Sequence, residues 1–130
     1  MNNLKDFIDS FINSKERNLQ LDIFRENKQV LFQLYKQYDV NRWEIRYDSI
    51  DLDSSVLELR FNREKTSNKK NKERFETSEA IKNFDLVEKD TYFRRFDSDM
   101  DAEEIENEII HLLKVVYEYN GQLIYTLNAY

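Results

Sequence analysis

Apolar side chains in the first forty residues recur at intervals of three and four positions. The residues with this spacing are Leu4, Phe7, Ile8, Phe11, Ile12, Leu19, Ile23, Val30, Leu31, Leu34, Tyr35 and Tyr38. A repeat close to 3.6 residues is typical of amphipathic helices. Asn13 and Ser14 interrupt the repeat and carry side chains that can cap helix ends. The spacing therefore predicts two N-terminal helices separated by this break.

From residue 42 onward the apolar repeat shortens to two. One alternating set is Trp43, Ile45 and Tyr47, and the other is Leu57, Leu59 and Phe61. Alternation of this kind is typical of strands that bury one face of a sheet. The connection at 48–55 is rich in Asp and Ser, which stabilise turns through side-chain hydrogen bonds to the backbone. The pattern predicts an antiparallel hairpin over residues 42–62.

A strongly basic segment follows the predicted hairpin. Residues 63–74 carry six Lys and Arg against two Glu, a local charge of +4, and no apolar side chain. Such a segment has nothing to bury, so we predict an exposed, mobile loop over residues 63–76. Beyond it, Ser78 can cap a short helical turn that ends near Asn83. Residues 84–96 favour extended structure, folded back near Lys89 and Asp90.

An acidic run leads into the most regular helical pattern of the chain. Residues 97–108 contain seven acids and no base, and the apolar positions of the helix are Ile105, Ile109, Leu112, Leu113, Val116 and Tyr117. Acids are favourable at a helix N-terminus because they face the positive end of the helix dipole. Asp101, with Glu104 three residues later, matches a capping box. At the other end, Asn120 and Gly121 predict a left-handed C-cap.

These elements together predict an α+β fold. Leu123, Tyr125 and Leu127 form a last alternating set, which indicates a strand after the long helix. We expect two N-terminal helices, an antiparallel or mixed sheet of four to five strands, and a long C-terminal helix followed by a final strand. The 130 residues match the size of one domain, so a single domain over 1–130 is predicted.

The composition excludes several classes of chemistry. The chain has one Gly, no Pro and no Cys. Phosphate-binding loops, dinucleotide-binding turns and nucleophile elbows need several glycines, and thiol nucleophiles, disulfides and Cys-ligated metals need cysteine. We therefore expect no cofactor. No stretch approaches 18 apolar residues and the N-terminus has no uninterrupted apolar segment, so we predict no membrane partner and a cytoplasmic location.

Two acidic clusters raise the question of a metal. Asp97, Asp99, Asp101 and Glu108 stand where a twelve-residue calcium loop carries acids, but Ala102 replaces the glycine that its turn requires. A capped helix start is the simpler interpretation.

The second cluster consists of Asp48, Asp51 and Asp53, followed by a strand with Glu58 and Arg60. A magnesium-dependent nuclease needs carboxylates and a basic group that converge on one metal ion. A turn capped by Asp side chains explains the same acids, so a metal-dependent hydrolase is an alternative and not the main hypothesis.

Little else in the chain favours catalysis. His111 is the single histidine, so only one imidazole is available as a base near neutral pH. Its position on the predicted helix favours a partly buried structural role. We therefore predict that the protein is not an enzyme.

The basic segment offers a second functional alternative. Lys69, Lys70, Lys72 and Arg74 could contact a phosphate backbone, which would make the protein a nucleic-acid-associated factor. The formal net charge of −6 and the pI near 4.9 argue against nucleic acid as the partner, because nucleic-acid-binding domains are typically basic.

The main hypothesis is a small protein-binding module. Aromatic residues make up 14% of the chain, and tyrosine and tryptophan often anchor protein interfaces. The candidate partner-binding residues are Trp43, Tyr47, Glu103, Glu104, Glu106, Tyr117 and Tyr119. They would form an acidic, aromatic surface for a basic protein partner or a second copy of the chain. Inhibitors, immunity proteins, adaptors and chaperones are modules of this general type.

Overall fold

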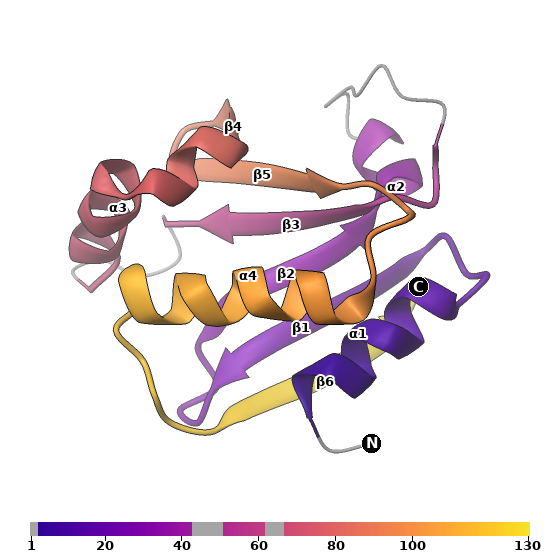
Figure 1. Cartoon of the computed structure of the whole chain (residues 1–130), viewed down its shortest axis with the longest axis horizontal. Helices are drawn as coiled ribbons and strands as arrows, with labels where there is room; N and C mark the ends of the chain where they lie inside the picture. The colour runs from indigo at the N-terminus through magenta and orange to yellow at the C-terminus, as the bar shows by residue number, and fades with distance from the viewer. Residues whose placement is uncertain (1–2, 43–50, 62–66) are drawn as a thin grey trace.

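The computed structural model describes residues 3–42, 51–61 and 67–130, and within them the chain forms an α+β fold (Figure 1). The strands are β1 (Leu19–Arg25), β2 (Val30–Lys36), β3 (Ser55–Arg60), β4 (Asp85–Glu88), β5 (Thr91–Phe96) and β6 (Leu123–Ala129). The helices are α1 (Leu4–Asn13), α2 (Gln37–Arg42), α3 (Ser67–Thr77) and α4 (Ala102–Val115), with a 3-10 turn η1 at Glu79–Asn83.

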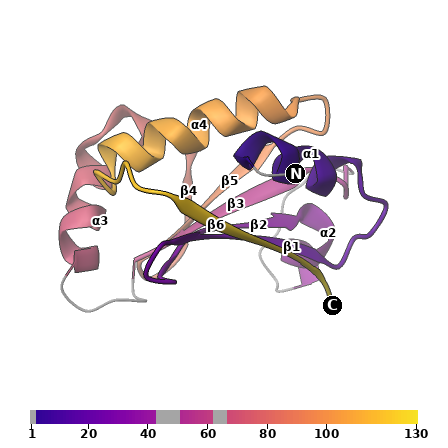
Figure 2. The ribbon, with the colours of Figure 1, turned by 90° about the horizontal axis from the view of Figure 1, so that it is seen from below.

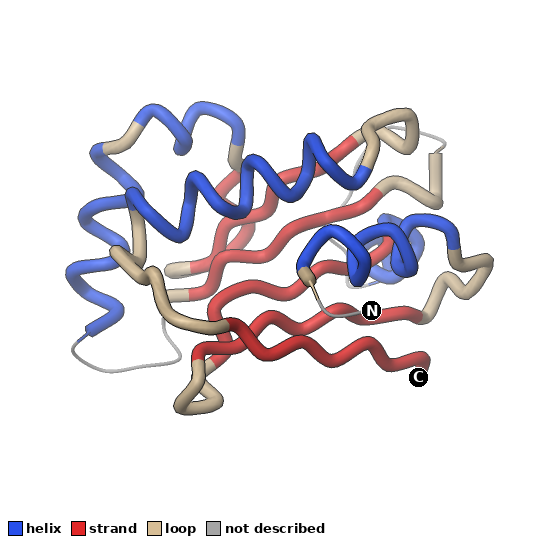
Figure 3. Tube along the Cα trace, turned by 60° about the horizontal axis from the view of Figure 1, so that its bottom comes forward, coloured by secondary structure: helices blue, strands red, loops and turns tan. Residues whose placement is uncertain are grey.

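All the strands belong to one antiparallel sheet in the order β4-β5-β3-β2-β1-β6. Helices α1 and α4 lie across one face of this sheet (Figures 2 and 3). The main core fills the space between them, with Phe11 from α1, Leu21 and Leu57 from the sheet and Ile109 from α4 fully buried. The α+β class predicted from the sequence is confirmed, with six strands in place of four or five.

Helix α1 forms where the first repeat predicts it. The Asn3 side chain caps it by accepting a hydrogen bond from the Asp6 amide (2.9 Å). Leu4, Ile8 and Phe11 lie on its buried face, as a spacing of three and four residues requires. The first predicted helix is confirmed.

The second predicted N-terminal helix is wrong. Residues 19–36 form the hairpin β1–β2, and only the short α2 follows it. Leu19 and Ile23 are four apart, a spacing that a strand satisfies as well as a helix, and the buried Leu21 between them fixes the period at two. Lys28 adopts a positive φ of 69° in the turn, which allows the chain to reverse without glycine.

The strand over Leu57 and Leu59 is confirmed as β3, but its predicted partner is wrong. β2 pairs with one edge of β3 and β5 with the other, so both edges of β3 are occupied by these two strands. A central strand buries both faces, which explains why Val56 and Glu58 are buried beside the leucines. Trp43, Ile45 and Tyr47 lie outside the described residues.

The basic segment is largely helical and not the mobile loop that its composition predicted. Helix α3 covers Ser67–Thr77, and residues 62–66 lie outside the described part. Lys, Arg and Glu are good helix formers. Tertiary packing then holds the helix, because the buried ring of Phe75 contacts Phe84 and Tyr92, with ring centroids 5.0 and 4.9 Å away. The one apolar residue near the end of α3 therefore anchors this helix.

The next elements follow the prediction. Ser78 precedes the turn η1, and β4 and β5 form the extended segment. The chain reverses between them at Lys89 and Asp90, where Asp90 has a φ of 62°. The carbonyl of Asp90 accepts a hydrogen bond from the Phe61 amide (2.7 Å), which ties this turn to the end of β3.

Helix α4 also begins as predicted, but it ends differently. Asp101 and Glu104 form both hydrogen bonds of the capping box. The helix stops at Val115, and Glu118, not Gly121, takes the left-handed conformation after it (φ 50°). The predicted C-cap at Asn120 and Gly121 is therefore wrong.

The face of the sheet opposite α1 and α4 carries a smaller apolar cluster. Tyr35, Val56 and Phe93 from the sheet pack there with Val40 of α2. None of the helices in the described ranges is long and apolar enough to cross a membrane.

Candidate functional site

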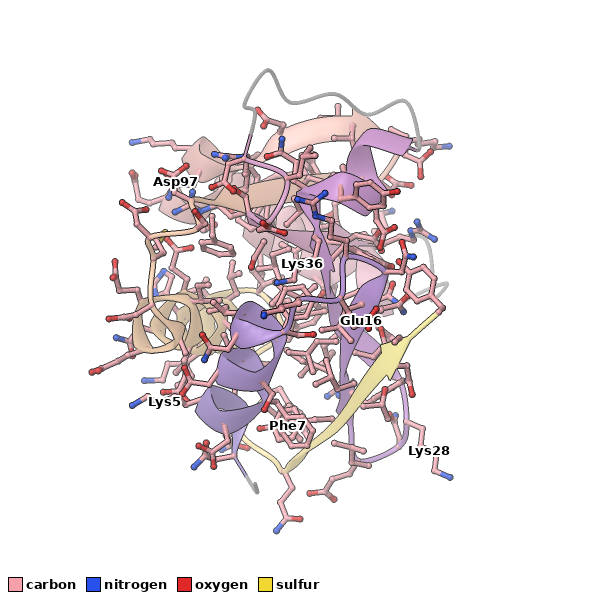
Figure 4. All side chains as sticks on the ribbon, turned by 90° about the vertical axis from the view of Figure 1, so that its right-hand side faces the viewer. Lys5, Phe7, Glu16, Lys28, Lys36 and Asp97 are labelled. Carbon is pink, nitrogen blue, oxygen red and sulfur yellow. The ribbon has the colours of Figure 1, made fainter. Side chains whose placement is uncertain are left out.

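One end of the sheet gathers acidic side chains from two distant segments of the sequence. In the antiparallel pair of β3 and β5, Ser55 lies opposite Phe96, so the start of β3 is adjacent to the end of β5. The residues that precede β3 and those that follow β5 must therefore meet. We call this surface the acidic end, and its residues are Asp51, Asp53, Asp97, Asp99, Asp101, Glu103 and Glu104. It lies at the right of Figure 1 and faces the viewer in Figure 4.

Hydrogen bonds at Asp51 join the two segments. One Asp51 carboxylate oxygen accepts from the Ser98 amide (3.3 Å) and the other from the Asp53 amide (3.3 Å). Hydrogen bonds from the hydroxyls of Ser98, the larger effect, and of Ser54 lower the pKa of Asp51. Asp51 is therefore a carboxylate at neutral pH, and its negative charge holds the loop before β3 against the turn after β5.

Arg95 connects the segments that form the acidic end. Its guanidinium donates to Asp97 (2.5 Å), to the buried hydroxyl of Ser54 (2.7 Å) and to the side-chain oxygen of the buried Gln37. These contacts connect the end of β5 with the start of β3 and the start of α2. Because the guanidinium fork has a fixed geometry, it orients all three segments at once.

The acids differ in how they are used. Asp97 pairs with Arg95 and Asp53 pairs with Arg17 (3.2 Å). Asp101 and Glu104 cap α4. Asp99 and Glu103 are exposed and make no ion pair with a base in the described residues. The surface therefore keeps a net negative charge, with Asp99 and Glu103 available to a partner.

A buried lysine lies behind the acidic end. Lys36 is only 1% exposed, and its ammonium donates to the carbonyl of Ile12 (3.3 Å) and lies 4.7 Å from the ring centroid of Phe11. Burial lowers the pKa of Lys36, while the negative charges of Asp53 and Asp51 act in the opposite direction. Lys36 lies opposite Ser55, at the start of β3, and both Lys36 and Asp97 are labelled in Figure 4.

The structure does not assemble the predicted partner-binding residues into one surface. Glu103 and Glu104 are exposed in the first turn of α4, and Glu106 is half-buried in the same helix. Tyr117 is 6% exposed, and its hydroxyl donates to the carbonyl of Leu31 (2.9 Å) inside the core. The prediction that Tyr117 anchors a partner is therefore wrong.

Tyr119 lies beyond the far end of the same helix. At 1.5 Å per residue, Glu103 and Val115 are about 18 Å apart along the axis, so Tyr119 cannot share a contact patch with the acids of the first turn. Trp43 and Tyr47 lie outside the described residues. Among the described residues, the acids of the first turn of α4 are thus separated from Tyr119.

The acids of the calcium alternative, Asp97, Asp99, Asp101 and Glu108, have mostly structural roles. Asp97 pairs with Arg95, Asp101 caps a helix, and Glu108 accepts two hydrogen bonds from Arg94 (2.7 and 3.1 Å). These three acids are engaged elsewhere, so none of them is available to bind a metal ion together with Asp99. Across the ranges that the structure describes, no group of three or more His, Cys, Asp or Glu residues is placed to hold a metal ion.

The acids of the nuclease alternative are also divided. Asp51 and Asp53 belong to the acidic end, whereas Glu58 is buried in the central strand and lies 3.3 Å from the guanidinium of Arg60. Asp48 lies outside the described residues. The described members therefore do not converge on one point.

The predicted nucleic-acid contacts are partly occupied by structural interactions. Lys72 pairs with Asp90 (2.6 Å). Arg74 donates to the carbonyl of Val116 (2.8 Å) and to Asn71 (2.8 Å) and lies 3.5 Å from Glu118. Only Lys69 and Lys70 of the four remain exposed.

A cavity of about 310 Å³ lies between η1, β5 and α4. Its wall includes Phe84, Leu112 and His111, together with Arg94 and Glu108. His111 is exposed, so the prediction that it is partly buried is wrong. Arg94 and Glu108 pair with each other in this wall, and Glu79, which also lines the cavity, pairs with Lys82. Sequence reasoning missed this cavity, the Arg95 network and the burial of Lys36, and no motif or spacing in the chain indicates them.

Comparison of the chain with protein-family models, with curated proteins and with solved structures finds no match.

Proposed function

We propose that this chain is a non-enzymatic protein-binding module whose acidic end binds a basic surface of a partner protein. The single observation that supports this most strongly is the contact between Asp51 and Ser98. It joins two acidic segments that are far apart in the sequence into one surface. The hydrogen bonds of Arg95 then orient that surface before any partner arrives.

The proposed mechanism is electrostatic recognition. Exposed carboxylates steer a basic partner during encounter and suppress binding of acidic proteins. Asp99 and Glu103 supply direct ion pairs, and the paired acids around them add to the negative field. Binding would cover a Lys- or Arg-rich site of the partner, as an inhibitor or an adaptor does. Affinity should fall as salt rises, since the Debye length is only about 8 Å at physiological ionic strength.

The test compares two double variants with the same change of charge. D99K/E103K reverses the two acids without a structural partner, whereas E73K/D85K reverses exposed acids on α3 and β4. Tagged wild-type protein and both variants would capture proteins from nuclease-treated host lysate at low and high salt. We expect wild type and E73K/D85K to retain the same basic protein at low salt and D99K/E103K to lose at least 90% of it.

Two outcomes would contradict the proposal. Equal capture by both variants would show that the acidic end is not the contact surface. Capture that disappears with nuclease treatment would show that nucleic acid mediates it, and the exposed Lys69 and Lys70 of α3 would then be the residues to neutralise. Melting curves of both variants would confirm that they are folded.

A further inference from the structure

The two edges of the sheet differ in how well they are protected. β4 has four residues, carries Asp85 and Glu88, and shifts register against β5 between Leu86 and Glu88. Charges and irregular register of this kind prevent another strand from pairing with an edge. The edge formed by β4 is therefore a protected edge.

β6 forms the opposite edge and has none of these features. Its seven residues pair with β1 in unbroken register, from Leu123 opposite Arg25 to Ala129 opposite Leu19. The strand contains no charged residue and no proline, and no strand of the described chain lies beyond it. Figures 1 and 3 show it at the outer margin of the sheet. A long, regular, uncharged edge of this kind is a template for pairing with another strand.

One backbone hydrogen bond between the segments of β6 and β1 shows which backbone groups of β6 point outward. The Tyr130 amide donates to the carbonyl of Asn18 (2.8 Å), so the backbone groups of Tyr130 point toward β1. Successive residues of a strand point their N–H and C=O groups to opposite sides. Leu123, Tyr125, Leu127 and Ala129 therefore direct their backbone donors and acceptors away from the sheet.

Apolar side chains flank this edge on both faces. On the helix face, the ring of Tyr125 lies 4.8 Å from the ring of Phe7 on α1, and both are half-buried (Figure 4). Leu127 is also half-buried there. On the opposite face, Ile124 is 39% exposed. A strand added at β6 would bring its own side chains against all of these residues and cover them.

A second copy of the chain fits this edge, because β6 carries no charge and its outward-pointing groups can pair with the same groups of another β6. An antiparallel copy related by a two-fold axis at Thr126 sets Leu123 opposite the second copy's Ala129. It also sets Tyr125 opposite the second copy's Leu127. Every outward-pointing residue then meets another one, and each such pair exchanges two hydrogen bonds. Because β6 carries no charge, no like charges meet.

We propose that β6 pairs with β6 of a second copy of this chain, antiparallel and with Thr126 on the two-fold axis, to form one continuous sheet across the dimer. Two-fold dimers are the commonest protein oligomers, and facing threonines are a favourable cross-strand pair. The proposed contact is made by one seven-residue strand from each copy, so we expect the dimer to dissociate on dilution.

A cysteine at Thr126 tests this arrangement in a chain that has no other cysteine. On the two-fold axis Thr126 forms a pair without backbone hydrogen bonds, with Cα atoms about 4.5 Å apart. That separation suits a disulfide. We expect Thr126→Cys to form a covalent dimer rapidly under mild oxidation with a copper–phenanthroline catalyst and air, as measured on non-reducing gels.

The matched control is Ile124→Cys, on the same face of the same strand. In the proposed dimer its copies are four residues apart along the strand, about 13 Å, so the single variant should link at least tenfold more slowly than Thr126→Cys. Residue 124 instead faces residue 128 of the other copy. An equimolar mixture of Ile124→Cys and Asn128→Cys should therefore give a mixed covalent dimer.

Three outcomes would overturn the proposal. Thr126→Cys could link no faster than Ile124→Cys, or the mixture could give no mixed dimer. Wild-type protein could also sediment as a monomer at every concentration. A charge exchange gives an independent measure: Thr126→Lys should shift dissociation to a higher protein concentration, and mixing it with Thr126→Glu should restore the dimer. Circular dichroism would verify that each variant folds.

Discussion

Tyr119 and Gly121 determine how the chain passes from α4 to β6. The Tyr119 hydroxyl donates to the carbonyl of Gln122 (2.6 Å) and accepts from the amide of Glu26 (3.3 Å). A Cβ atom at position 121 would lie only 2.5 Å from this hydroxyl oxygen. Gly121 has no positive φ, so its role is to make room for the ring and not to supply an unusual backbone conformation.

Gly121→Ala should therefore destabilise the protein by displacing the Tyr119 ring. We expect a loss of about 1 kcal/mol in the free energy of unfolding, in the range of other overpacked sites. Tyr119→Ala removes the ring, so Gly121→Ala should cost almost nothing in that background. Urea unfolding of the two single variants and the double variant measures this coupling. Equal costs in both backgrounds would show that the close approach is not the reason for glycine.

Lys36 is a second residue whose environment can be tested alone. Its ammonium is buried, and burial lowers its pKa below the usual 10.5. Below the lowered pKa the charge is present in both the folded and the unfolded state, so folding must desolvate it. Lys36→Met removes that cost, and we expect a gain on the order of 1 kcal/mol at pH 7.

The pH dependence of this gain follows from the direction of the pKa shift. Between the lowered pKa of the folded state and 10.5, the folded protein loses the proton of Lys36 before the unfolded chain does. The free energy of unfolding of wild type therefore rises with pH over this range, and that of Lys36→Met does not. The difference in stability between the two proteins becomes smaller. Urea unfolding at a series of pH values measures the difference, with Lys5→Met as an exposed control. A gap that is constant with pH would contradict this account.

Among the elements, α3 depends most on contacts outside itself. Its sequence is almost entirely polar, so it cannot bury an apolar face along its length. It is held by the ring of Phe75 in the core, the ion pair of Lys72 with Asp90, the hydrogen bond of Arg74 to Val116 and the hydrogen bond that Glu76 accepts from the Tyr92 hydroxyl. The basic residues of α3 therefore have different structural roles, which the amino-acid composition of the segment does not reveal.

Single substitutions should distinguish the basic residues that anchor α3 from those that are only exposed on its surface. Arg74→Ala removes a charge-assisted hydrogen bond to the last turn of α4 and leaves the buried Asn71 without that donor. We expect a loss of about 1–2 kcal/mol in the free energy of unfolding. Lys70→Ala, at an exposed position of the same helix, should change it by less than about 0.5 kcal/mol. Thermal and urea unfolding of both variants provide the measurement, and equal effects would contradict the assignment of Arg74.

The whole molecule separates its two proposed interfaces across the sheet. The acidic end lies where β5 meets α4, and β6 is four strand positions away from β5, about 19 Å. No described residue belongs to both surfaces. A dimer formed through β6 would therefore present two acidic ends, each able to bind one partner.

This separation predicts that the two interfaces are independent. Introducing D99K/E103K into the Thr126→Cys variant should leave the rate of disulfide formation unchanged within about twofold, because distant sites rarely couple. Conversely, Thr126→Lys should retain the partner captured by wild type. Non-reducing gels and the lysate capture measure the two effects. Loss of both dimer formation and partner capture in either variant would show that the two surfaces act together.

The sequence by itself determined those elements whose local signals agree with one another. In α4, the capping box of Asp101 and Glu104 and the apolar spacing from Ile105 onward indicate the same helix, and the structure has it. The first helix, the strand over Leu57 and Leu59 and the turn at Lys89 and Asp90 were also predictable. In each case the signal lies within a few residues of the element that it specifies.

Only the tertiary structure decided the rest, because the deciding contacts join residues distant in sequence. Leu19 and Ile23 fit either period until β1 pairs with both β2 and β6. The basic segment becomes a helix through the burial of Phe75, and Tyr117 is removed from the surface by a core that includes Leu31. The acidic end exists because antiparallel pairing sets the start of β3 beside the end of β5, so that Asp51 meets Ser98. No local spacing encodes such a meeting, since it depends on which strands become neighbours.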